Sequence, residues 1–312
     1  MDESQFVGLA TTTRLLQEKY GQRVAEVKPL AAGGWSQAYS FVHDEITYVI
    51  RWSRVADNFE RDAFARRYAR DGLPIPSIVA LGQADESFYA IAPFVTGNFL
   101  ETLASTELER TLPAILKMFR ALRSVDLPAT AGFGFWNGQG AGSHASWRAF
   151  LLDDKNDSAG SLIHGWRAKL EASSMGTTAF TQLWCALETF VKHCPDERSL
   201  VHSDLLNRNV LAAAGEITAL LDWGSSFYGD SLYDVAWFTF YEPWFPQFKQ
   251  LNLARRLLED FVDDPRTSKA DLEARLLCYL VDIGIGSIAY NAYIENWANG
   301  EEAAEYTLSL LR

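Results

Sequence analysis

The sequence predicts an α+β protein with two lobes: an antiparallel five-stranded sheet with one helix in residues 1–97, and a mainly helical lobe in residues 98–312. Two observations support this division. Short runs rich in β-branched and aromatic residues, separated by polar turns, are concentrated before residue 93, whereas longer segments with helical periodicity follow it. The chain of 312 residues is also long enough to bury two packed units.

The N-terminal lobe is expected to begin with a helix and a polar turn over residues 1–25. A helix is also expected over 58–70, because Asp71-Gly72 and two prolines, Pro74 and Pro76, would end it. The strands that we expect in this lobe are 26–30, 38–42, 46–52, 78–83 and 88–92.

The C-terminal lobe is expected after a hinge at residues 93–97, which show no regular periodicity. Thr106 and Glu109 form a capping-box pattern, which predicts a helix that reaches about Val125. A loop rich in glycine and aromatic residues should follow over 127–147. The remaining expected elements are helices over 146–152, 162–172, 179–193, 231–241, 250–263 and 270–294, and an irregular β-hairpin with strands 209–212 and 217–221.

One short segment carries three groups that phosphoryl transfer from a nucleotide requires. Asp204 follows an apolar strand, Asn209 comes five residues later, and Asp222 comes thirteen residues after that. A carboxylate can orient an acceptor hydroxyl and accept its proton, and an amide oxygen and a second carboxylate are hard ligands for Mg²⁺. The spacing is typical of a kinase catalytic loop and its metal-binding Asp, and it predicts a small-molecule kinase. Taken alone, Asp204 would be read as a turn or capping residue.

Other residues are candidates for the nucleotide site. Gly33, Gly34 and Ser36 join two expected strands, where backbone N–H groups and the Ser36 hydroxyl can bind phosphate oxygens, although a Gly-Gly turn is also common in hairpins. The sequence has no G-x-x-x-x-G-K-[ST] motif, which argues against a P-loop fold. The adenine base is expected to contact the hinge, through the carbonyl group of Pro93 and through the N–H groups and apolar side chains of Phe94 and Val95.

Arg51 lies near the end of the third expected strand, where a cation can bind the α- and β-phosphates. Its expected partner is an acid on the following helix, Asp62 or otherwise Glu60, because the phase of the helix is not fixed by sequence. The alternative is a surface arginine with a solvated acid.

Three residues are expected to support the catalytic segment rather than react. His202 should be a buried imidazole that braces the loop by hydrogen bonds. Asp230 fits the N-cap of the helix that follows, and Asp234, four residues further, is expected to brace the catalytic loop.

The charge distribution bears on partners. The net charge is −12, of which −2 falls in residues 1–97 and −10 in residues 98–312. Nucleic acid is therefore not an expected partner, whereas a polycationic substrate would be attracted to the acidic lobe, unless the acids serve only solubility. No targeting segment or unbroken apolar span is evident, so we expect a cytoplasmic monomer without membrane contact.

The motifs resemble those of the aminoglycoside phosphotransferase family, whose fold is protein-kinase-like. The resemblance implies ATP as donor with Mg²⁺, an aminoglycoside hydroxyl as acceptor, and antibiotic resistance as the outcome. It also implies Asp204 as base, Asn209 and Asp222 as metal ligands, and Ser36 and Arg51 as phosphate contacts. The segments that carry the likeness are 38–41, 48–51, 72–76, 132–134, 147–150, 200–204, 209–211 and 229–233, with a weaker likeness over 279–297.

The sequence does not fix which molecule accepts the phosphoryl group. Residues 205–208 and Glu242-Pro243-Trp244 depart from the pattern of the wider family. The same machinery would serve a kinase of a sugar, amino alcohol or amino acid, and a nucleotide-binding protein without catalysis is a third alternative. Ammonium groups of an amino-sugar would need carboxylates, each of which is otherwise a surface or capping acid. The candidates are Glu242, Asp153, Asp154, Asp282 and Glu295.

Overall fold

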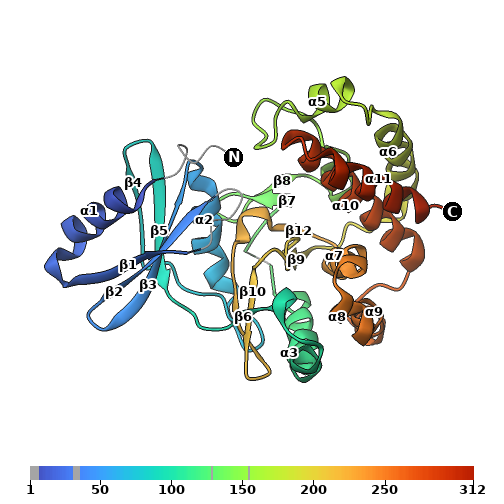
Figure 1. Ribbon diagram of the computed structural model, residues 1–312. Helices are drawn as coiled ribbons and strands as arrows, with labels where there is room; N and C mark the ends of the chain where they lie inside the picture. The colour runs from blue at the N-terminus through green and yellow to red at the C-terminus, as the bar shows by residue number, and fades with distance from the viewer. Residues whose placement is uncertain (1–6, 31–35, 128, 154) are drawn as a thin grey trace.

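The computed structural model describes residues 7–30, 36–127, 129–153 and 155–312. Its N-terminal lobe is the predicted five-stranded sheet, in which every neighbouring pair is antiparallel and the order is β1-β2-β3-β5-β4 (Figure 1). The expected strands are therefore confirmed, with ends shifted by one or two residues. Their bounds are β1 Val24–Pro29, β2 Gln37–His43, β3 Ile46–Ser53, β4 Ala80–Ala84 and β5 Ser87–Pro93.

Helices cover this sheet. Along β2 the side chains of Tyr39 and Phe41 are buried, because alternate residues of a strand face the same side, and they form a small core with Leu16 of α1 (Leu9–Tyr20). Helix α2 (Ala56–Ala65) lies between the sheet and the C-terminal lobe (Figure 1). It ends five residues earlier than predicted and continues only as a 3₁₀ turn, Arg66–Tyr68.

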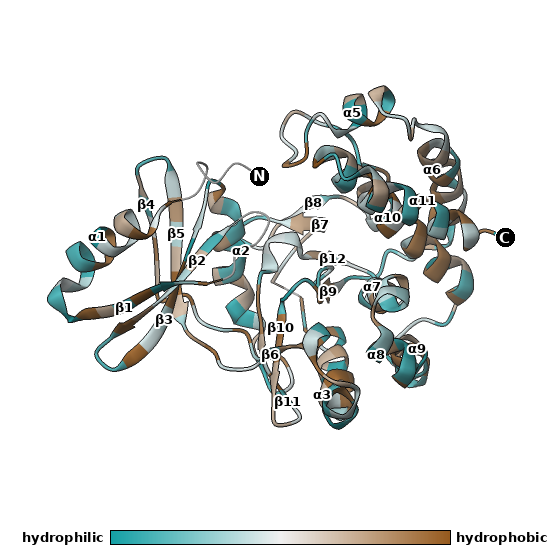
Figure 2. Cartoon of the chain, in the orientation of Figure 1, coloured by the Kyte–Doolittle hydropathy of each residue, from teal (hydrophilic) through white to brown (hydrophobic). Residues whose placement is uncertain are grey.

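The C-terminal lobe is mainly helical, as predicted. Its centre is α10, whose many apolar residues (Figure 2) contact α5, α6, α7 and α11. None of the helices in the described ranges has the length and apolar content needed to cross a membrane. The bounds are α3 Ser105–Arg123, α4 Trp147–Asp153, α5 Trp166–Ala172, α6 Thr178–Phe190, α7 Leu232–Tyr241, α8 Pro246–Leu251, α9 Leu253–Asp263, α10 Leu272–Tyr293 and α11 Trp297–Ser309.

Several predictions for this lobe were wrong. Helix α3 begins at Ser105, so Thr106 lies inside the helix and no side chain caps it; the carbonyl of Ala104 accepts the first N–H bonds instead. The single helix expected over 250–263 is two helices, divided at Asn252 by its left-handed backbone (φ 50°). Helix α11 was not predicted.

The loop expected over 127–147 contains two strands, β7 (Phe133–Trp136) and β8 (Gly142–His144). They join β12 (Phe227–Gly229) and β9 (Ser199–Val201) in a four-stranded sheet of order β8-β7-β12-β9. Phe227 of β12 pairs with Phe135 of β7, which lies 92 residues earlier, so no local pattern predicts this sheet.

A third sheet places the catalytic segment beside the hinge. The predicted hairpin is present as β10 (Val210–Ala213) and β11 (Glu216–Leu220), and β10 also pairs with β6 (Asn98–Phe99), which follows the hinge. Gly97 makes this approach possible, because a Cβ there would lie 2.8 Å from Thr218 Oγ1 and 3.0 Å from the carbonyl oxygen of Ala212.

Candidate active site

Asp204 lies in the loop between β9 and β10, and its carboxylate is held by two amides. Asn207 Nδ2 donates to Asp204 Oδ1 (2.7 Å), and Asn209 Nδ2 donates to Asp204 Oδ2 (2.9 Å) and to the Asp204 carbonyl oxygen (2.8 Å). Burial raises the pKa of Asp204 to about 7. The two amide hydrogen bonds lower this pKa, and the nearby charge of Asp222 raises it by a smaller amount than burial does. A carboxylate of this proton affinity is suited to accept a proton near neutral pH.

His202 braces the loop from inside. Its ring is fully buried, with Nε2 donating to the carbonyl oxygen of Leu221 (2.9 Å) and Nδ1 accepting from the backbone N–H of Asp204 (3.3 Å). Burial lowers the pKa of His202 to about 4, so the ring is neutral at physiological pH. This neutral ring links the residue before Asp222 to the backbone of Asp204, the candidate base.

Asp234 and Asp230 belong to the segment around α7 but contact different partners. Asp234 accepts the backbone N–H groups of His202 (3.0 Å) and Ser203 (2.8 Å), directly before Asp204. Asp230 accepts the N–H of Leu232 (3.0 Å) in the first turn of α7 and also forms a buried ion pair with Arg275 (2.6 Å). The N-cap position of α7 is Ser231, so the prediction of Asp230 was wrong by one residue, although its carboxylate does accept an N–H of the first turn. The ion pair with Arg275 was not predicted, and it makes Asp230 an anchor of α10 as well.

Asp222 follows β11 in a left-handed conformation (φ 57°, ψ 75°), which turns the chain back toward the N-terminal lobe. The next residue, Trp223, donates its backbone N–H to Asp62 Oδ1 (2.7 Å), and Asp62 Oδ2 forms an ion pair with Arg51. Burial opposes the charge on Arg51, but Asp62 and Asp222 outweigh it, so the pKa of the guanidinium is raised. Of the two acids proposed as the partner of Arg51, Asp62 is the one in contact.

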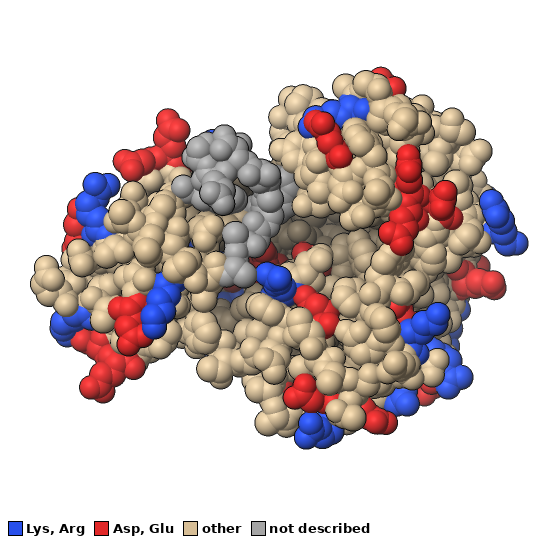
Figure 3. All heavy atoms as spheres, in the orientation of Figure 1, with Lys and Arg blue, Asp and Glu red and all other residues tan. Residues whose placement is uncertain are grey.

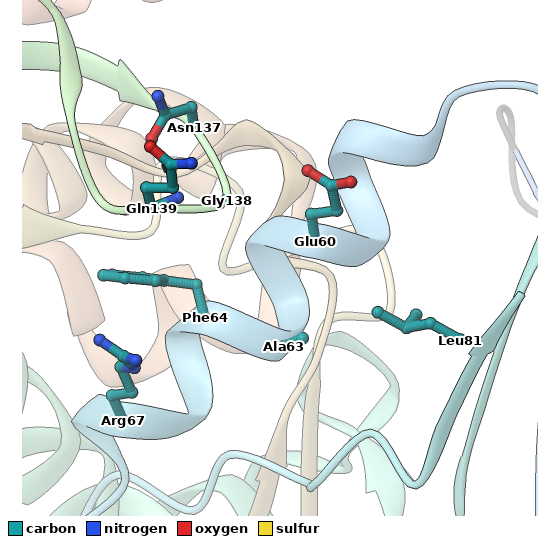
Figure 4. A pocket seen from close by; sticks show the side chains of 8 residues that line it. All are labelled: Glu60, Ala63, Phe64, Arg67, Leu81, Asn137, Gly138 and Gln139. Atoms are coloured by element: carbon teal, nitrogen blue, oxygen red, sulfur yellow. Dashed lines mark hydrogen bonds between the residues drawn. The ribbon is translucent and has the colours of Figure 1, made fainter.

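Glu60 instead lies on a cavity of about 550 Å³ between α2, β4 and the turn that joins β7 to β8 (Figure 4). The carboxylate of Glu60 is close to Gly138, since a Cβ on that glycine would lie 2.8 Å from Glu60 Oε2. Neither Asp204 nor the two candidate metal ligands line this cavity, so we do not assign the nucleotide to it.

The remaining nucleotide candidates are only partly described. Gly33 and Gly34 lie outside the described residues, and Ser36 is half-buried directly before β2. At the hinge, the N–H of Phe94 donates to the carbonyl oxygen of Thr47 (2.9 Å), so this N–H is not available to the adenine base. Pro93, the last residue of β5, and Val95 lie on either side of it.

The described acids proposed for substrate binding all have partners within the chain. Glu242 accepts the N–H of Ala254 (3.0 Å) at the start of α9. Asp282 is 1% exposed and is bound by Tyr233 (2.8 Å) and Lys155 (3.4 Å), so it faces the interior. The exposed pairs are Glu295 with Lys169 (3.0 Å) and Asp153 with His144 (3.0 Å), and Asp154 lies outside the described residues.

Further residues near Asp204 were not predicted. Burial and the charge of Asp204 raise the pKa of Tyr241, which also has a hydrogen bond with Ser287, and of Tyr290. Tyr241 is the last residue of α7, and nothing in the sequence pairs it with Asp204. Figure 3 shows a hollow between the two lobes with acidic side chains at its floor.

The chain is similar to known phosphotransferases over most of its length. Residues 26–269 match the model of the phosphotransferase enzyme family. Hygromycin-B 4-O-kinase of Escherichia coli is 30% identical over 296 residues, which is 92% of this chain and 82% of that protein.

Solved structures agree. A thermostable mutant of aminoglycoside phosphotransferase APH(4)-Ia, in a ternary complex with AMP-PNP and hygromycin B, matches with a TM-score of 0.82 and 29% identity over 96% of this chain and 97% of the other. A putative fructosamine-3-kinase from Haemophilus somnus shares the fold alone, with a TM-score of 0.63 and 14% identity over 96% and 97% of the two chains. The protein is therefore a small-molecule kinase of kinase-like fold and belongs to the phosphotransferase enzyme family.

Proposed function

We propose that the chain transfers the γ-phosphate of Mg-ATP to a hydroxyl of an aminoglycoside antibiotic of the hygromycin B type, and thereby confers resistance. The observation that carries the proposal is the contact between Asp204 and Asn209, with Asp222 near enough to raise the pKa of Asp204. In this proposal Asp204 orients the acceptor hydroxyl and takes its proton as the phosphoryl group is transferred.

The residues proposed to hold Mg²⁺ are Asn209 and Asp222, and the donor set fits this ion. Asn209 is 6% exposed and its Nδ2 donates to two oxygens of Asp204, which leaves its Oδ1 as the atom available to a cation. Asp222 supplies a carboxylate, and Mg²⁺ commonly uses one or two protein ligands and completes its octahedron with phosphate oxygens and water. The ion would neutralise charge on the phosphate oxygens.

The rest of the nucleotide is proposed to bind across the hinge. Arg51, held by Asp62, would contact the α- and β-phosphates with Ser36 and the backbone of Gly33 and Gly34. The adenine base would lie at Pro93, Val95 and the exposed side chain of Phe94. We place the lobe boundary between residues 97 and 98, supported by the passage of the chain from β5 to β6, which pairs with β10 of the other lobe.

The acceptor is proposed to be cationic. The −10 charge of residues 98–312 favours a polycation over a neutral sugar. A kinase of another hydroxylated metabolite is the second candidate, favoured by the internal pairing of the acids expected to bind ammonium groups. We further propose that the enzyme is a cytoplasmic monomer.

Mass spectrometry of the reaction products tests the proposal. The protein is incubated with ATP and MgCl₂ and with hygromycin B, other aminoglycosides, neutral sugars and amino alcohols. Addition of one phosphoryl group to an aminoglycoside is expected, with the highest kcat/KM for hygromycin B. Faster turnover of an acceptor without ammonium groups would favour the second candidate, and size-exclusion chromatography tests the monomer.

A further inference from the structure

Two consecutive residues of the catalytic loop adopt an unfavourable backbone conformation. Asn207 (φ 58°) and Arg208 (φ 68°) are both left-handed, a region that side chains other than glycine rarely occupy. They lie between Asp204 and Asn209, so their conformation determines how these two side chains meet. Such a turn persists only where its surroundings hold it in place.

Two contacts hold this turn, one from within the loop and one from outside. Asn207 donates to the carboxylate of Asp204 (2.7 Å), and the backbone N–H of Arg208 donates to Glu101 Oε1. Glu101 comes from the 3₁₀ turn Leu100–Thr102, which follows β6 directly after the hinge. A carboxylate acceptor makes a stronger hydrogen bond with a backbone N–H than a neutral group does.

Contacts of three other residues hold the backbone of Glu101 in place. Leu100 and Leu103, its neighbours along the turn, are 0% and 5% exposed and belong to the main core. Gln247 of α8 donates Nε2 to the Glu101 carbonyl oxygen (2.6 Å). The backbone that carries the carboxylate is therefore rigid, and Glu101 can impose a conformation on the loop.

We propose that Glu101 is a positioning residue, whose hydrogen bond to the Arg208 N–H holds the left-handed turn that brings Asp204 and Asn209 together. This inference rests on the proposed roles of Asp204 and Asn209. Glu101 is not proposed to touch the reacting atoms. Because its turn lies directly after β6, it also ties the geometry of the catalytic loop to the end of the hinge.

Four variants separate the hydrogen bond from other effects. Glu101→Ala removes the acceptor and is expected to lower kcat on the order of 10- to 100-fold, with the KM values for ATP and acceptor changed less than about threefold. Glu101→Met keeps the approximate side-chain volume without the acceptor, and its kcat should equal that of Glu101→Ala. This variant guards against a folding defect caused by the smaller alanine. Glu101→Gln retains an acceptor oxygen and should stay within about threefold of wild type. Glu109→Ala, which removes an exposed acid of α3, is the matched control.

A second background tests the link to backbone conformation. Glycine adopts the left-handed region freely. In the Arg208→Gly background, the further change Glu101→Ala should therefore lower kcat by less than about threefold. The proposal would be overturned if Glu101→Ala lowered kcat equally in both backgrounds. It would also be overturned if Glu101→Ala had the kcat of wild type, or if Glu101→Gln were as slow as Glu101→Ala.

Amide hydrogen exchange provides a readout that needs no acceptor. The Arg208 amide should exchange at least tenfold faster in Glu101→Ala than in wild type, and unchanged exchange would contradict the contact. Because this measurement does not depend on turnover, failure of the positioning role is distinguishable from failure of the proposed function.

Discussion

Lowering the pH should destabilise the protein through His202, because its buried ring resists protonation. The folded pKa is about 4 and the unfolded value 6.5, so the unfolded chain binds the proton first as the pH falls. The stability contributed by the neutral ring is complete above about pH 6.5 and is lost as the pH falls toward about pH 4. Between about pH 8 and about pH 5, the linkage removes about 2 kcal/mol from the free energy of unfolding.

Urea denaturation across this pH range measures the effect. Carboxylates contribute to the pH dependence as well, so wild type is compared with His202→Asn, which has no titrating ring. The loss of stability from pH 8 to pH 5 should be smaller in His202→Asn by about 2 kcal/mol. His164→Asn, which replaces a ring whose side chain is 55% exposed, should leave the loss unchanged.

Parallel pH dependence in wild type and His202→Asn would refute this reasoning. Proton NMR gives an independent check that requires no variant to fold. One of the five histidines should remain neutral down to about pH 5, and titration of all five near pH 6.5 would contradict the burial argument.

Three further substitutions have defined outcomes. Asp204→Ala should abolish turnover while leaving nucleotide affinity within about threefold, measured by product mass and calorimetry, and substantial turnover would show that another group is the base. Asp222→Ala should weaken Mg-ATP binding tenfold or more with less effect on ATP binding without Mg²⁺; equal affinities would remove it from the metal site. Asp230→Ala should lower the free energy of unfolding by about 3–5 kcal/mol and lower the thermal midpoint, because Arg275 would stay buried and unpaired. The control Asp263→Ala, which removes an exposed acid, should not lower the thermal midpoint.

Sequence reasoning succeeded where the relevant groups are close in sequence. Asp204 and Asn209 are five residues apart, so their contact is a property of one loop. Three of the four strand pairs in the N-terminal lobe, β1–β2, β2–β3 and β4–β5, join strands that are consecutive in sequence. The partner of Arg51 was narrowed to two acids on one helix. The choice of Asp62 over Glu60 depends on tertiary packing: α2 lies against the turn after Asp222, and the N–H of Trp223 in that turn donates to Asp62.

Contacts between distant segments were beyond such reasoning. Asp230 meets Arg275 across 45 residues, and Glu101 meets Arg208 across 107 residues. Strand β7 pairs with β12, which is more than ninety residues away, and the N–H of Phe94 is bound by Thr47 of the neighbouring strand β3. Each depends on how elements pack, for which a local run of residues carries no signal.

A crystal structure with Mg²⁺, AMP-PNP and hygromycin B tests the central claim most directly. We predict that the ion binds Asn209 Oδ1 and the Asp222 carboxylate, with Arg51 on the phosphates and Asp204 within hydrogen-bond distance of an acceptor hydroxyl. Phosphates seated elsewhere, for example in the cavity beside Glu60, or an acceptor hydroxyl remote from Asp204, would contradict it.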